Sequence, residues 1–101
     1  MTFDKITFFA YNKAMEKDLV DILCEISDRE TMHKFLSEIL TVAEKKDLIL
    51  RWELLKQLAR GKSQRSIAAD LHISLCKITR GAKILKDPSS VCYQKLKQDK
   101  P

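Results

Sequence analysis

Glycine and proline are scarce in this chain. Only two Gly and two Pro occur among 101 residues, and neither type occurs before Gly61. Because these residues dominate tight turns and interrupt helices, their scarcity argues against a turn-rich β architecture and favours long helices. The hydrophobic share of 45% is ordinary for a folded protein. The composition therefore predicts an all-α protein.

Long apolar runs and paired cysteines are also missing. No apolar run approaches the roughly 18 residues of a membrane span. Residues 1–11 combine a short apolar patch with an early acidic residue and little basic charge, a poor composition for a signal peptide. The three cysteines, Cys24, Cys76 and Cys92, are odd in number, widely spaced and without a metal-ligand repeat. We expect reduced thiols in a cytoplasmic protein.

The residue groupings of common enzymes are absent from the sequence as well. It contains no Ser-His-Asp or Cys-His arrangement at a usable spacing, no Gly-rich phosphate loop and no metal-ligand motif. His33 is expected at a solvent-facing helix edge and His72 in a turn. We expect no enzymatic activity, no metal site and no bound cofactor other than a regulatory ligand.

The basic charge is concentrated in the second part of the chain. Residues 1–59 carry a formal balance of −2, whereas residues 60–101 carry +7. Such a distribution is typical of a segment that binds phosphates. The alternative is a solvated basic tail, because Lys95, Lys97 and Lys100 lie near the C-terminus.

Residues 63–86 predict two short helices joined by a tight turn, the helix-turn-helix unit that places a helix in the DNA major groove. The apolar period breaks at residues 72–74 and then resumes. His72 falls where such turns need a left-handed residue, and Ser74 is a natural N-cap for the second helix. The apolar positions are Ile67, Ala68, Leu71, Ile73 in the turn, Leu75, Ile78, Ile84 and Leu85.

Further apolar periods and caps predict six helices in all. The first spans about residues 9–27, Asp28 caps the second, and Thr41 with Glu44 forms a capping box for the third. Gly61 is expected just past the third helix and Ser63 at the cap of the fourth. Asp87 is predicted to cap the last helix, with Pro88 in its first turn and Val91, Tyr93 and Leu96 packing inward.

One domain, residues 1–101, is predicted to have three parts. Residues 1–61 form dimerisation core helices, residues 62–86 the DNA-reading head, and residues 87–101 a C-terminal helix and tail. Leu19, Val20, Ile22 and Leu23 cover more than one stripe of the first helix, which suggests burial on two sides. Interlocking with a second copy would satisfy both sides, and a helical monomer is the alternative.

Several blocks of this sequence resemble the bacterial tryptophan repressor family. The most specific block is Ile78-Thr79-Arg80-Gly81 followed by Lys86. The resemblance spans about residues 15–97, and its other blocks are Ser63-Gln64-Arg65, Leu40-Thr41 with Glu44, Arg51, Leu54-Leu55 and Arg60-Gly61. It implies an intertwined homodimer of six-helix subunits. It further implies L-tryptophan as corepressor and a palindromic operator with half-sites about one helical turn apart, as in tryptophan repressors.

A ligand pocket between the core and the reading head also follows from this resemblance. The Arg80 guanidinium can bind a carboxylate and stack on a ring, although a phosphate contact or a surface ion pair is the alternative. Gly81 leaves room for a ligand ring or for close helix packing. Lys77 and Ile84 replace small polar residues of the family, and Glu38 falls near an apolar wall. The predicted ligand-binding residues are Leu40, Thr41, Arg51, Leu55, Lys77, Arg80, Gly81 and Ile84; Arg51 matches a ring-stacking position, and Leu40 and Thr41 match positions that receive an amino group.

A second set of residues is predicted to contact DNA. Leu75 and Cys76 suit thymine methyl groups, and Thr79 can hydrogen-bond base edges or water. For Cys76 the alternative is a packed small hydrophobe. The full set is Gln64, Arg65, Leu75, Cys76, Thr79, Lys83 and Lys86, of which Gln64 and Arg65 suit a phosphate or base edge and the two lysines suit the DNA backbone.

These observations predict a sequence-specific DNA-binding repressor, activated by a corepressor for which L-tryptophan is the first candidate. Two alternatives remain. One is a regulator of the same fold that needs no corepressor, and the other is a helical module that binds a protein partner. A basic reading head with exposed Leu75 and Cys76 favours DNA, whereas a purely apolar exposed groove favours a protein partner.

Overall fold

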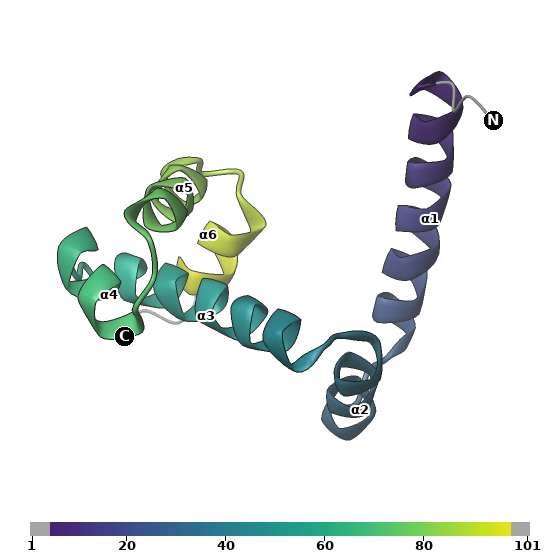
Figure 1. Cartoon of the computed structure of the whole chain (residues 1–101), viewed down its shortest axis with the longest axis horizontal. Coiled ribbons are helices and arrows are strands. Elements are labelled where there is room, and N and C mark those ends of the chain that lie inside the picture. The colour runs from purple at the N-terminus through teal and green to yellow at the C-terminus, as the bar shows by residue number, and fades with distance from the viewer. Residues whose placement is uncertain (1–4, 98–101) are drawn as a thin grey trace. The chain divides into compact units, whose positions relative to one another are not determined.

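The protein folds into helices throughout the part described by this computed structural model, which covers the backbone of residues 5–97 and the side chains of residues 12–97. No strand occurs in that range, which confirms the predicted all-α class. The side chains of residues 1–11, on which the signal-peptide prediction rests, and residues 98–101 of the predicted tail lie outside the description. The six helices are α1 (Lys5–Glu25), α2 (Arg29–Ile39), α3 (Val42–Ala59), α4 (Gln64–Leu71), α5 (Leu75–Lys86) and α6 (Val91–Lys97) (Figure 1).

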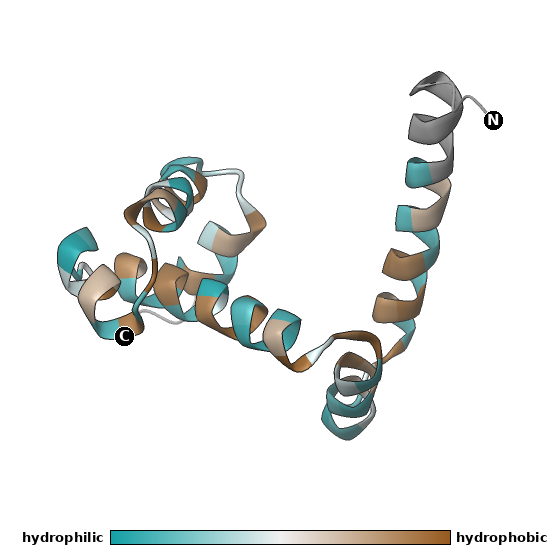
Figure 2. Ribbon diagram, viewed as in Figure 1, coloured by the Kyte–Doolittle hydropathy of each residue, from teal (hydrophilic) through white to brown (hydrophobic). Residues whose placement is uncertain are grey.

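The chain divides into two compact units, residues 1–41 and residues 42–101. In the first unit Asp28 caps α2 as predicted, because its Oδ2 accepts a 2.8 Å hydrogen bond from the Thr31 N–H. No described side chain of this unit is buried. Apolar residues follow one another along the second half of α1 (Figure 2), and Met15 is 61% exposed. Apolar side chains of α1 are therefore exposed to solvent within the first unit.

The end of α3 confirms the predicted role of Gly61. Its φ of +89° lies in the left-handed region, where a residue without a Cβ is unstrained. The Gly61 N–H donates to the Leu58 carbonyl at 3.0 Å, and the Lys62 N–H donates to the Gln57 carbonyl at 3.1 Å. These are the two hydrogen bonds of the Schellman motif, which satisfy the last carbonyls of a helix. The motif directs the chain from α3 into α4.

The turn between α4 and α5 has the predicted geometry at each of its key positions. Ser63 Oγ accepts from the Ser66 N–H at 3.2 Å and so caps α4, whereas Ser74 Oγ accepts from the Lys77 N–H at 3.4 Å and caps α5. His72 adopts the left-handed conformation, with φ 54° and ψ 47°. The half-buried side chain of Ile73 packs against the core from inside the turn. Local sequence therefore specifies this connection.

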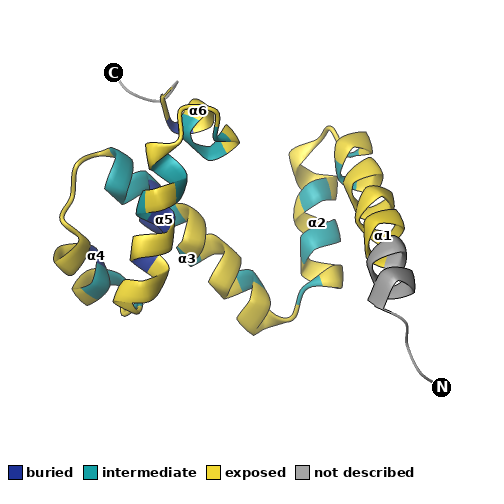
Figure 3. Ribbon diagram, turned by 90° about the horizontal axis from the view of Figure 1, so that it is seen from above, coloured by how far each residue is buried: buried dark blue, intermediate teal, exposed yellow. Residues whose placement is uncertain are grey.

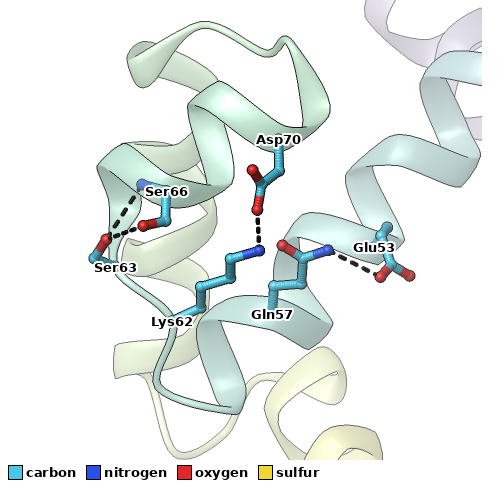
Figure 4. A network of polar contacts seen from close by, with 6 residues as sticks. All are labelled: Glu53, Gln57, Lys62, Ser63, Ser66 and Asp70. Carbon is cyan, nitrogen blue, oxygen red and sulfur yellow. Dashed lines mark hydrogen bonds and ion pairs between the residues drawn. The ribbon is translucent and has the colours of Figure 1, made fainter.

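Polar contacts also join the turn after α3 to α4 (Figure 4). The Lys62 ammonium pairs with the Asp70 carboxylate, which joins the turn after α3 to the end of α4. The Ser63 hydroxyl donates to the Ser66 hydroxyl at 2.9 Å, next to the cap. Because these contacts are exposed, each contributes little free energy by itself.

The core of the second unit lies where α4, α5 and α6 meet the second half of α3 (Figures 1 and 3). Ile67 and Ile78 are 0% exposed, so one residue from each helix of the turn unit anchors it to the core. The core residues are Leu54, Leu55, Ile67, Ile78 and Leu96. Apolar residues nearer the start of α3 lack such packing, since Leu48, Ile49 and Trp52 are 50%, 59% and 42% exposed.

The predicted start of the last helix was wrong. Helix α6 begins at Val91, and Ser90 caps it by accepting from the Tyr93 N–H at 3.2 Å. Asp87 instead ends α5, and its Oδ1 accepts from the backbone N–H and the hydroxyl of Ser89 at 2.9 and 2.7 Å. An Asp side chain that bonds to the backbone two residues later stabilises a turn, which competes with helix initiation.

The packing predicted for α6 is only partly observed. Leu96 is buried and Tyr93 is half-buried, as expected, but Val91 is 71% exposed. Cys92, at the next position, packs against the core instead, so the inward face of α6 consists of Cys92, Tyr93 and Leu96.

Candidate functional site

A cavity of about 210 Å³ lies between α3 and α5 within the second unit. Arg51, Leu54 and Leu55 line it from α3 at relative positions that share one helix face. Lys77, Arg80, Gly81 and Ile84 line it from α5 with the same kind of spacing. The structure therefore brings six of the eight predicted ligand-binding residues to one cavity: Arg51, Leu55, Lys77, Arg80, Gly81 and Ile84.

The remaining two predicted ligand residues belong to the first unit and are described there only. Leu40 is half-buried at the C-terminal end of α2, where its N–H donates to the Leu36 carbonyl at 3.0 Å. Thr41 is exposed at the next position, and Glu38 is exposed on α2. Their predicted roles toward the ligand stay predictions.

Leu54 is a lining residue that the predicted set lacked. It is 2% exposed and lies three positions after Arg51 on the same face of α3. The helical spacing could have identified it, because residues three and four apart are neighbours on a helix surface.

The cavity joins three cationic side chains to an apolar wall. Arg51, Lys77 and Arg80 are exposed, and no acidic residue lines the cavity. Salt bridges among the residues whose side chains are described include Lys17–Asp21, Lys56–Glu53 and Lys62–Asp70. A molecule with an acidic group and an apolar body suits such a lining, because guanidinium and ammonium groups bind carboxylates by charge-assisted hydrogen bonds.

Gly81 permits the close approach of α5 to α3. A Cβ at this position would lie 2.6 Å from Leu54 Cδ1 and 3.2 Å from Leu55 Cδ2. The first distance is shorter than real Cβ contacts, and Leu54 is buried, so its side chain has little room to move. Of the two explanations that the sequence leaves open, close helix packing is therefore supported directly, although Gly81 also lines the cavity.

All seven predicted DNA-contacting residues are exposed on α4 and α5. Leu75 is 52% exposed, and the exposure of Cys76 rules out its alternative as a packed small hydrophobe. The Thr79 hydroxyl donates to the Leu75 carbonyl at 2.9 Å, so its oxygen keeps lone pairs that can accept from a base or water. The exposed residues are Gln64, Arg65, Leu75, Cys76, Thr79, Lys83 and Lys86.

Different residues of α5 therefore face the core, the cavity and solvent. Ile78 and Gly81 are buried against the core, while Lys77, Arg80 and Ile84 line the cavity. The predicted DNA-contacting residues on the same helix face solvent. A ligand in the cavity would therefore contact the helix that carries most of the predicted DNA contacts.

Two further kinds of site are absent from the described residues. None of their helices has the length and apolar composition to cross a membrane. The same residues contain no group of His, Cys, Asp or Glu side chains placed to hold a metal ion.

Comparison with known proteins identifies the family of this chain. The family described as "Trp repressor protein" matches residues 15–100. A Trp operon repressor homolog of Xylella fastidiosa is 41% identical over 70 residues, which cover 68% of this chain and 76% of that protein. The Trp operon repressor homologs of Vibrio campbellii and Vibrio parahaemolyticus are each 30% identical over 82 residues, covering 80% of this chain and 82% and 80% of those proteins. The chain therefore belongs to the Trp repressor protein family, a family of transcription regulators.

Proposed function

We propose that this protein is a sequence-specific DNA-binding repressor that acts as a homodimer and responds to a small ligand, with L-tryptophan as the first candidate. One observation carries the proposal: α5 forms a wall of the α3–α5 cavity and also presents Leu75, Cys76, Thr79, Lys83 and Lys86 to solvent. Helix α4, the turn and helix α5 would act together as a helix-turn-helix.

DNA binding is supported by the charge and exposure of this unit. Residues 60–101 carry a formal balance of +7, and Arg65, Lys83 and Lys86 are exposed. Exposed cations neutralise DNA phosphates, and the counterions that they release drive association. The first residues of α5 include apolar Leu75 and the thiol of Cys76, which suit thymine methyl groups in the major groove.

Dimerisation is supported by apolar side chains that one copy leaves exposed. In the first unit Met15, Leu19, Val20 and Ile22 are 61%, 44%, 46% and 40% exposed. In the second unit α3 exposes Val42, Leu48, Ile49 and Trp52. Exposed apolar area of this kind favours association, because water is released when it is buried. A second copy of the chain is the proposed occupant of both surfaces.

Ligand control follows from linkage between the cavity and the DNA-binding helix. In this proposal Arg80 binds the ligand carboxylate, Arg51 stacks on its ring, and carbonyl groups of Leu40 and Thr41 receive its amino group. A ligand shifts the orientation of α5 only if it binds the DNA-competent arrangement more tightly than the other arrangement. The corepressor would therefore raise operator affinity by the same factor by which operator raises corepressor affinity.

The decisive experiment measures binding of operator fragments with and without each of the amino acids at one stated salt concentration. We expect L-tryptophan to raise the affinity, and we expect Arg80→Ala to abolish that response and to weaken operator binding. Lys95→Ala, on the exposed side of α6, is the matched loss of one positive charge outside the cavity, and it should keep the ligand response. Unchanged ligand affinity in Arg80→Ala would mean that Arg80 serves DNA alone.

A repressor of this fold that needs no corepressor is the second candidate. It is favoured by the half-buried side chain of Ile84, which lines the cavity at a position where the resemblance to tryptophan repressors implies a small polar residue. Equal operator affinity with every amino acid and without any would support this candidate and leave DNA binding intact. Absence of DNA binding under all these conditions would instead favour the protein-interaction module.

A further inference from the structure

Helix α5 carries an exposed hydroxyl group whose hydrogen-bonding role is already fixed within the helix. The Thr79 hydroxyl donates to the Leu75 carbonyl at 2.9 Å, and the side chains of both residues are exposed. We propose that Leu75 and Thr79 together recognise one A·T base pair in the major groove. Thr79 Oγ1 accepts a hydrogen bond from the adenine N6 amino group, and Leu75 contacts the thymine methyl group. This role rests on the proposed DNA-binding function and adds a base pair that the operator must contain.

The polarity of the Thr79 hydroxyl restricts the bases that it can bind. A carbonyl oxygen carries no hydrogen, so the hydroxyl must be the donor in its contact with Leu75. A hydroxyl has one hydrogen and two lone pairs, and Thr79 Oγ1 can therefore only accept from a further partner. In the major groove the donors on base edges are the N6 amino group of adenine and the N4 amino group of cytosine. Thr79 therefore favours these two bases over guanine and thymine.

The same hydrogen bond holds the Thr79 side chain in place. A β-branched side chain in a helix has few allowed χ1 rotamers, and a bond from Oγ1 to a carbonyl of the preceding turn favours the rotamer that makes it. To donate to a base, Thr79 would have to give up its bond to the Leu75 carbonyl, which would cancel most of the gain. Accepting from an amino group keeps both hydrogen bonds.

The neighbouring side chain decides between adenine and cytosine. Residues four apart are adjacent on a helix surface, with Cβ atoms separated by about 5–6 Å. Leu75 is 52% exposed and apolar. The guanine that pairs with cytosine presents the acceptors N7 and O6, which would lose water beside a leucine without gaining a partner. The thymine that pairs with adenine presents a methyl group, whose burial against Leu75 is favourable. The two side chains therefore fit an A·T pair better than a C·G pair.

Base analogues that lack single groups test the proposal. The full chain is first used to select duplexes from a random library, in the presence and in the absence of L-tryptophan. Each A·T pair of the selected half-site is then altered singly. Adenine is replaced by unsubstituted purine, which lacks the N6 amino group, or thymine is replaced by uracil, which lacks the methyl group. Affinities are compared at one stated salt concentration, because phosphate contacts make them salt-dependent.

At one A·T pair of each half-site, the two replacements should act through different residues. Purine should weaken the binding of the unmodified protein about fivefold more than that of Thr79→Val, which keeps the side-chain shape but has no acceptor. Thr79→Ser keeps the hydroxyl and should respond to purine like the unmodified protein. Uracil should weaken the binding of the unmodified protein about fourfold more than that of Leu75→Ala. Comparison between variants removes the effect of purine on the duplex itself. Because both residues are exposed, the variants should stay folded, which circular dichroism checks.

Several results would overturn the proposal. They are a purine effect that is the same in the unmodified protein and in Thr79→Val at every position, effects of Thr79 and Leu75 at different base pairs, or a Thr79-dependent preference for any base but adenine. Equal Thr79-dependent affinity for adenine and guanine would indicate a bridging water, which can both donate and accept, and would likewise contradict direct recognition. Selected sites without such an A·T pair would refute this role alone. If no sequence is selected, the repressor proposal fails as well.

Discussion

Gly81→Ala tests whether close packing of α5 on α3 explains the glycine in the middle of α5. The added Cβ would lie 2.6 Å from Leu54 Cδ1, on a side chain that is 2% exposed. Overpacking of a core by one carbon costs about 1–3 kcal/mol. Ala is preferred to Gly inside a helix by about 1 kcal/mol, which offsets part of that cost. We therefore expect a net loss of about 1 kcal/mol in the free energy of unfolding.

Urea and thermal denaturation, followed by circular dichroism at one fixed protein concentration, measure this loss. For a unit of this size, 1 kcal/mol corresponds to a decrease in Tm of about 4–8 °C. Lys83→Ala, at an exposed position of the same helix, is the control and should change the free energy of unfolding by less than about 0.5 kcal/mol.

A double-mutant cycle locates the cause of the effect. Leu54→Val shortens the side chain that the new Cβ would meet, so the double variant should lose less stability than the sum of the two single variants. Residues in direct contact show coupling energies of about 0.5–3 kcal/mol. The reasoning is refuted if Gly81→Ala stabilises the protein by about 1 kcal/mol, because helix propensity alone would then decide the outcome. Strict additivity in the cycle would show that Leu54 is not the obstacle.

Two further predictions concern backbone conformation and charge. Gly61→Ala should lower the urea-derived free energy of unfolding by about 1–2 kcal/mol, because the φ of residue 61 is +89°, although no atom lies within 4 Å of the added Cβ. Gly61→Asn should lower it less, because Asn tolerates the left-handed conformation better than Ala. An equal loss in both variants would contradict this cause. Hydrogen bonds lower the pKa of three carboxyl groups below their usual values of 3.8 for Asp and 4.5 for Glu. The side chain and N–H of Thr31 donate to Asp28, and the side chain and N–H of Ser89 donate to Asp87. The side chain of Gln57 donates to Glu53. A lowered pKa means that the unfolded chain binds more protons, so this stabilisation is present above pH 4.5 and is lost as the pH falls through and below 3.8. Urea midpoints between pH 6 and pH 3 measure the loss, which should be smaller in Glu53→Gln; an identical acid loss in that variant would exclude Glu53 from the effect.

The positions of helices and turns followed from local sequence with few errors. The caps at Asp28, Ser63 and Ser74 and the left-handed residues Gly61 and His72 all have the predicted roles. Each of these depends on atoms within a few residues of one another, so the chemistry of the segment is sufficient to specify it. The error at Asp87 has the same local character, because Asp87 and Ser90 both cap well and the Asp87–Ser89 turn decides between them.

The candidate site was predicted residue by residue from a family resemblance, and its geometry required the fold. Arg51 and Arg80 are far apart in the sequence and line one cavity only because α5 packs across α3. Helical spacing places Leu54 on the same face of α3 as Arg51, but only the packing of α5 on α3 shows that this face lines a cavity. That Arg51, Lys77 and Arg80 line one cavity is likewise a property of the assembled helices and not of any single segment.

The sequence by itself determined the all-α class, the turn between α4 and α5, the family and the concentration of positive charge after residue 59. These depend on composition, local hydrogen bonds and residue patterns that need no distant partner. Only the tertiary structure decided why residue 81 is glycine, which apolar side chains one copy buries, and which three cations share a cavity. The physical reason is that close contact between helices depends on side-chain shape and on their crossing, and neither is encoded in any single segment.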